Sequence, residues 1–275
     1  MKKFLLKICL FFGLCAAVIV GTYAAYFVRL RTMSFALPPD KKIVFIGDSH
    51  IEVGVNETLI PNAYNFAKSG DPYLDQLARL KRLLEDNPQV ETIFITATPH
   101  SLARYGDQRI FSDFVMQSVV PTAFPLYSRR ERDLYLKKDP LRLAKFVFGK
   151  PMSSAKRTID ACLSRQRAMA KLGARHDSAG RNLEKSIAVE RELRPGKKLH
   201  GDDSCGTELQ VAYLREIVEL TRSRGARIIF LNPPLYRAEE FFDVAYFENL
   251  LKEKFSDVEF WDYADFPMPD DCRQD

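Results

Sequence analysis

Residues 42–50 read KIVFIGDSH, and this stretch decides the fold. The four residues after the lysine are β-branched or aromatic, which predicts a short buried strand. Gly47 permits a sharp turn, so Ser49 is expected to face solvent at the start of a helix. A hydroxyl there can attack as a nucleophile while nearby backbone N–H groups stabilise an oxyanion. The alternative, that Asp48 or Ser49 only caps the helix, has equal weight on these residues.

The same alternation of strand and helix continues on either side of a long central segment. Strands are predicted near 63–66, 92–98, 227–231 and 258–261, and helices near 74–84, 208–224 and 241–255. Such alternation predicts an α/β fold of three layers, with a mostly parallel sheet between helices. Ligands in such sheets bind beyond the carboxyl ends of the strands. Here those ends carry the residues 47–50, 98–101 and 232–234.

The N-terminus predicts a membrane anchor. No charged residue occurs from Ile8 to Val28, while three lysines precede this stretch and Arg29 and Arg31 follow it. About 20 such residues in a helix cross a hydrocarbon core of roughly 30 Å. We therefore expect residues 1–31 to be an uncleaved signal-anchor, with the N-terminus in the cytoplasm and the main domain outside, periplasmic or on the cell surface. A cleaved signal peptide processed near residues 22–25 is the alternative.

The rest of the chain is expected to form a linker, at 32–41, and one α/β domain, at 42–275, with an insertion at about 103–204. Residues 129–198 hold 20 Lys/Arg against 8 Asp/Glu, and helices are predicted near 141–148 and 155–171. We interpret the basic segment as a solvated helical surface. The alternative is contact with anionic lipid headgroups or an acidic envelope polysaccharide. No nucleic-acid motif is present, so no nucleic-acid partner is expected.

The cysteines predict neither a disulfide framework nor a metal site. Cys162, Cys205 and Cys272 lie outside the apolar stretch, an odd number, although a Cys162–Cys205 pair is allowed in an oxidising compartment. No two cysteines have metal-ligand spacing. We expect no metal and no cofactor.

Two blocks of this sequence resemble the SGNH, or GDSL-like, hydrolase superfamily. Gly47-Asp48-Ser49 matches the family's first block, and His50 is similar to a branch that acetylates envelope polysaccharides or D-alanylates teichoic acid. The resemblance implies a flavodoxin-like fold with Ser49 as the nucleophile. The segment 65–70 (NFAKSG) matches the second block, which implies that the amide of Gly70 contributes to an oxyanion hole. The two blocks cover roughly residues 42–102.

Two departures from the family pattern stand out. The family's third block has an asparagine, but residues 96–101 here read TATPHS; Thr98, His100 or Ser101 could substitute. The family's last block, Asp-x-x-His, supplies the general base and the acid that orients it. No histidine follows His200 in this sequence, so we expect that block to lie beyond residue 275.

The remaining polar residues have weaker functional interpretations. His50, His100, Asn65 and Thr98 are candidates for lining the site, whereas Asp48 is expected chiefly to hold the turn. His176 and His200 are expected on the surface. The sequence thus predicts a membrane-tethered serine esterase or acyltransferase acting on a cell-envelope glycan, inactive if its base is missing. The alternative is a non-catalytic, membrane-anchored scaffold of envelope polymer assembly.

Overall fold

The fold is built on one parallel sheet. The structure is a computed structural model that describes residues 2–104, 106–153, 159, 162–173, 207–234 and 242–266. In this part of the chain the strand order is β2-β1-β3-β4-β5 and every pairing is parallel. The strands are β1 (Ile43–Ile46), β2 (Ala63–Asn65), β3 (Thr92–Thr96), β4 (Arg227–Asn232) and β5 (Glu259–Asp262). The predicted α/β class with a parallel sheet is confirmed.

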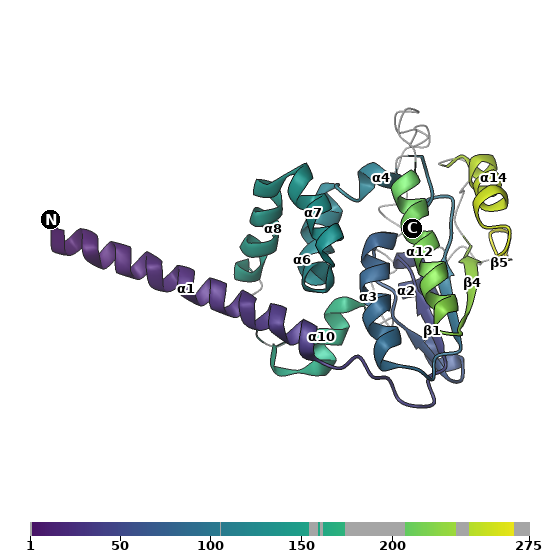
Figure 1. Cartoon of the computed structure of the whole chain (residues 1–275), viewed down its shortest axis with the longest axis horizontal. Coiled ribbons are helices and arrows are strands. Elements are labelled where there is room, and N and C mark those ends of the chain that lie inside the picture. Colours follow the sequence, from purple (N-terminus) through teal and green to yellow (C-terminus); the bar gives the residue numbers. More distant parts are fainter. Residues whose placement is uncertain are drawn as a thin grey trace, which may run out of the picture.

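Helices pack on both faces of the sheet because side chains alternate along each strand. Ile46, Ile95 and Phe230 share one apolar cluster with α3 (Tyr73–Asp86), α12 (Glu208–Ser223) and α14 (Val244–Lys254). The opposite face carries Phe45, Phe94 and Ile229, which cluster with Ile51 of α2 (Ser49–Gly54). Figure 1 shows α3 and α12 side by side over the sheet. The core therefore has helix, sheet and helix layers.

Two predicted element boundaries shift for local reasons. Strand β3 ends at Thr96 and not at Thr98, because the N–H of Ser101 donates to the Thr98 carbonyl at 3.1 Å and closes a turn. Helix α14 begins at Val244, since the Asp243 carboxylate accepts from the N–H of Tyr246 at 2.9 Å and so caps the helix.

The described residues between β3 and α12 form helices joined by short turns, which agrees with the helices predicted for the insertion. The short 3-10 helix η1 (Glu57–Leu59) lies before β2, whereas the insertion contains α4 (Gly106–Arg109), α5 (Asp113–Ser118), α6 (Val120–Ala123), η2 (Phe124–Leu126), α7 (Arg129–Lys138), α8 (Pro140–Ser153) and α10 (Arg165–Leu172). Part of the helix predicted at 155–171 lies outside the described residues. So do His176, His200, Cys205 and Cys272, so the Cys162–Cys205 pairing stays a prediction.

The N-terminal helix α1 (Lys2–Thr32) is long and apolar enough to cross a membrane. Its first turns project away from the body, as Figure 1 shows, while Tyr23, Tyr26 and Leu30 are buried in the main core cluster. The apolar stretch predicted from sequence is therefore one continuous helix whose last turns belong to the fold.

The segment predicted as a linker is packed against α3. The N–H of Phe35 donates to the Asp86 carboxylate and the N–H of Leu37 donates to Asn87 Oδ1, both at 2.6 Å. Asn87 Nδ2 donates back to the Phe35 carbonyl at 2.9 Å. Phe35 is fully buried and Leu37 nearly so. Buried apolar residues alternate with exposed residues over 33–37, so one side of this linker packs on the domain.

Candidate active site

The site begins at the turn between β1 and α2. Asp48 caps α2: its Oδ1 accepts from the N–H of His50 at 3.1 Å, and the residue is buried. Gly47 is required because a Cβ there would overlap the Thr96 side chain on β3. The capping interpretation of Asp48 therefore agrees with the structure. Ser49 is the first residue of α2 and is half-buried.

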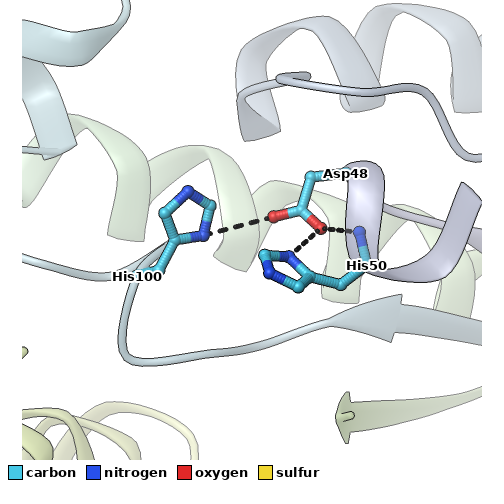
Figure 2. Close-up of side chains that lie close together, drawn as sticks. All are labelled: Asp48, His50 and His100. Carbon is cyan, nitrogen blue, oxygen red and sulfur yellow. Dashed lines mark hydrogen bonds and ion pairs between the residues drawn. The ribbon is translucent and has the colours of Figure 1, made fainter. Parts of the chain in front are cut away.

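Asp48 also orients a histidine. The Nδ1 atom of His50 lies 3.0 Å from Asp48 Oδ1, as Figure 2 shows. A carboxylate accepts a hydrogen bond, so this contact favours the tautomer with the proton on Nδ1. In this tautomer Nε2 is the basic nitrogen of the ring. A carboxylate paired with Nδ1–H in this way is the arrangement that orients the base of a serine triad.

His100 lies on the other side of the same carboxylate. Its Nδ1 is 3.4 Å from Asp48 Oδ2, and its ring centroid is 5.3 Å from that of His50 (Figure 2). Arg109 of α4 donates to His100 Nε2, and Phe242 packs edge-on against the ring at 5.7 Å. Because Arg109 occupies Nε2, His100 holds the site in place and is not the better base.

The charges of this cluster follow from burial and from Arg109. Burial and the neighbouring Arg109 lower the pKa of His100 to about 3, so the ring is neutral at pH 7. Burial alone would raise the pKa of the Asp48 carboxyl, but the hydrogen bond from His50 and the positive charge of Arg109 hold it well below its usual range. Asp48 is therefore a carboxylate throughout the physiological range.

The glycine loop predicted as an oxyanion hole lies beside this turn. The N–H of Lys68 donates to the Gly47 carbonyl at 2.9 Å, and the N–H of Ser69 donates to Glu52 of α2 at 2.7 Å. Gly70 has φ +72°, which only glycine adopts without cost. Asp48 and Gly70 line one small cleft together with Asp71, Pro72, Tyr73, Gln76, Ser101, Arg109 and Gln210. Ser49 adjoins this cleft but is not one of its lining residues.

Replacing Gly70 with alanine should destabilise the protein more than the same change at Gly225. Both residues have φ near +73°, so both changes carry the left-handed strain of roughly 1 kcal/mol. Only at Gly70 would the new Cβ also overlap a side chain, the ring of Phe114; at Gly225 it meets nothing within 4 Å. We expect an additional loss of about 1–3 kcal/mol at Gly70. Thermal unfolding of both variants measures the difference, and equal losses would show that the Phe114 contact is loose.

Two other candidates have structural roles. Asn65 Nδ2 donates to the carbonyls of Ile51 and Val55, at 3.0 Å each, and so fastens β2 to the end of α2. Thr98 is fully buried and exchanges hydrogen bonds with Ser101 within their turn. Neither lines the cleft described above. Ser101 does, and its hydroxyl lies 3.0 Å from that of Tyr73.

A buried ion pair supports the floor of the cleft. Asp71 bonds Arg79, and neither side chain is exposed to solvent. Arg79 also donates to the Phe66 carbonyl at 2.8 Å and to the Leu172 carbonyl of α10. Burial raises the pKa of Asp71 to about 6 against the lowering effect of Arg79, so the pair is ionised at neutral pH. The insertion is thereby tied to the loop that contains Gly70.

Asp48, His50 and His100 also bring three metal-ligand atoms close together, which the sequence did not indicate. One ligand atom from each lies within 4.8 Å of the others, and two histidines with a carboxylate suit zinc or iron. Arg109, however, donates to His100 Nε2, which places the proton of this neutral ring on Nδ1, the atom that faces Asp48. A cation would have to displace that proton beside a guanidinium. The donor set therefore fits acid–base chemistry better than a metal.

Acidification should destabilise the fold through His100. Its folded pKa of about 3 lies below the ordinary 6.5, so the unfolded chain takes up a proton that the folded chain does not. The stability it contributes is complete above pH 6.5 and is lost as pH falls, by ~2 kcal/mol at pH 5. Between pH 7 and pH 5 the melting temperature should fall roughly 4–8 °C more for wild type than for His100→Gln, which keeps an acceptor for Arg109. If the melting temperatures of wild type and His100→Gln fell equally, protonation of His100 would not be the cause of the acid destabilisation.

The sequence pattern indicated that the two histidines belong to the site, but it did not indicate Arg109 or Gln210. His50 and His100 directly follow neighbouring parallel strands, and that placement predicts their proximity. Arg109 gave no such signal, because it lies in a four-residue helix of the insertion. Gln210 likewise reaches the cleft from the start of α12, which Asp107 caps through the N–H groups of Leu209 and Gln210 at 2.9 Å.

Comparison with known proteins adds no relative. No family model, curated protein or solved structure matches this chain.

Proposed function

We propose that this protein is a membrane-tethered serine esterase or acyltransferase acting on a cell-envelope glycan. The observation that carries the proposal is the contact between Asp48 and the His50 ring, next to the predicted nucleophile Ser49. It offers a base and its orienting acid within the first block, so activity would not depend on a later Asp-x-x-His block. The strand order also agrees with the flavodoxin-like arrangement that the SGNH resemblance implies.

The reaction would follow the two-step course of a serine acyl-enzyme. Ser49 Oγ attacks the ester carbonyl while its proton passes to His50 Nε2, and the N–H groups of Ser49 and Gly70 bind the oxyanion. The tetrahedral intermediate then breaks the ester C–O bond, and His50 returns the proton to the departing alcohol. Water or a glycan hydroxyl next attacks the acyl-Ser49, with His50 again as base. Attack by water gives hydrolysis, and attack by a glycan hydroxyl gives acyl transfer.

The anchor supports an extracytoplasmic site for this chemistry. Helix α1 has the length and apolarity of a membrane span, and a short basic head precedes it. With the N-terminus in the cytoplasm, the body would face the periplasm or the cell surface, where envelope glycans lie. The basic insertion would add attraction for acidic polysaccharides.

Labelling with a fluorophosphonate probe separates this function from that of a non-catalytic scaffold. We expect the full chain in detergent micelles to react, and Ser49→Ala to abolish the label, because the phosphorus must bond the Ser49 oxygen. Ser101→Ala is the matched control: its hydroxyl lines the cleft, yet labelling should persist. Equal labelling of wild type and Ser49→Ala, or no labelling of either, would favour the scaffold.

A further inference from the structure

The exposed part of α1 is too short to cross the membrane before the helix begins to pack against the body. A hydrocarbon core of roughly 30 Å needs about 20 helical residues. Residues from Lys2 to Leu14 are exposed, but Cys15 and Ile19 are half-buried and Tyr23, Tyr26 and Leu30 are buried against the body. At about 1.5 Å per residue, these thirteen exposed residues cover only about 20 Å. The body must therefore approach the bilayer while α1 is still crossing it.

The contacts of α1 identify which segments of the body lie nearest the membrane. The Tyr26 hydroxyl donates to the Thr122 carbonyl at 3.4 Å, and Arg31 Nε donates to the Pro125 carbonyl at 3.1 Å. Helix α8 packs on α1 as well. In Figure 1 α8 stands beside α1, closer to the projecting end of α1 than α6 or α7. Of these three helices, α8 is therefore the first to meet the membrane that α1 crosses.

The side chains of α8 suit that position. Leu143 and Val147 face the body and are buried, whereas Leu141 is 83% exposed and Ala144 and Lys145 are exposed beside it. An exposed leucine near a lysine is what an interfacial helix presents to acyl chains and phosphate groups. We propose that α8 lies in the headgroup region of the bilayer beside α1, with Leu141 inserted and Lys145 paired to anionic lipid.

In this position the insertion would hold the body at the membrane whether or not Ser49 is catalytic. Helix α8 packs against α1, and residues 33–37 pack against α3. These contacts fix the body to its anchor, so the candidate active site stays at a constant distance from the membrane. A cleaved signal peptide would break this arrangement, because processing near residues 22–25 would cut through the turns that hold Tyr23 and Tyr26.

Fluorescence quenching by brominated lipids tests the position of α8. Trp261, the only tryptophan, lies on the edge strand β5, far from the projecting end of α1 (Figure 1). The full chain is reconstituted in phosphatidylcholine and phosphatidylglycerol vesicles whose lipids are brominated near the carbonyl end of the acyl chain. In the Trp261→Phe background, Leu141→Trp should be quenched by roughly half, whereas Trp261 of the wild type should keep its fluorescence.

Ala144→Trp in the same background provides a second probe on the exposed side of α8, should Leu141→Trp fail to fold. Removal of phosphatidylglycerol, or Lys145→Glu, should reduce the quenching. If the α8 tryptophans are quenched no more than Trp261, the proposal is overturned. A blue-shifted emission without bromine quenching would overturn it as well, because it would show that α8 is covered by protein and not by lipid.

Discussion

His50→Gln is expected to lower the rate of acyl-enzyme formation by roughly 10³-fold or more, because Ser49 would lose the group that takes its proton. In the proposed mechanism His50 takes this proton, and its Nδ1 lies 3.0 Å from Asp48 Oδ1. Stopped-flow measurement with a chromogenic ester gives the rate. His100→Gln is the control: Arg109 already engages that ring, so the loss should be at most about tenfold.

Asp48→Asn tests the same dyad without removing the helix cap. Asparagine caps a helix about as well as aspartate, so the melting temperature should change little. The rate should nevertheless fall by about 10³- to 10⁴-fold, because an amide neither selects the Nδ1–H tautomer nor stabilises the imidazolium. If the rate and the stability fell together, Asp48 would be only a structural residue of the turn. Unchanged rates for both His50→Gln and Asp48→Asn would remove the dyad from the mechanism.

Asp71→Asn should cause the largest loss of stability among the changes described, about 3–5 kcal/mol. It leaves the guanidinium of Arg79, which is fully buried, without its counter-charge. Since Arg79 also holds the carbonyls of Phe66 and Leu172, the insertion should loosen from the β2–α3 loop. Thermal unfolding in detergent measures the loss, and amide exchange should rise in α10 and near Gly70 first.

A matched control comes from an exposed ion pair. Lys42 Nζ lies 2.6 Å from Glu91, and the two side chains are 47% and 63% exposed. Glu91→Gln should therefore cost no more than about 0.5 kcal/mol. If Asp71→Asn were as mild as Glu91→Gln, water would be reaching Arg79, and the buried network would not be the support of the cleft.

The sheet could be predicted from sequence because its strands are short apolar runs that end in turn residues. The run ending at Gly47 and the one beginning at Thr92 each gave a strand, and the leucine spacing after Pro72 gave α3. Parallel pairing followed from the alternation of strands and helices. The observed end of β3 at Thr96 and the observed start of α14 at Val244 differ from the predicted boundaries. In both cases a local hydrogen bond sets the boundary, and the spacing of apolar residues gives no information about such bonds.

The site was less predictable because its parts meet only through tertiary packing. Asp48 and Gly70 came from neighbouring strand ends, which sequence order reveals. Arg109 comes from the irregular insertion, and its effect on His100 depends on a fold that the basic composition does not specify. The packing of the linker was not predicted either, because the burial of Phe35 against α3 depends on the whole domain.

Peptide mass spectrometry after fluorophosphonate treatment of the full chain tests whether Ser49 is the nucleophile. We expect a phosphonyl adduct on the peptide that contains Ser49, and its disappearance in His50→Gln under the same exposure. An adduct on Ser101 or another residue, with Ser49 unmodified, would contradict it.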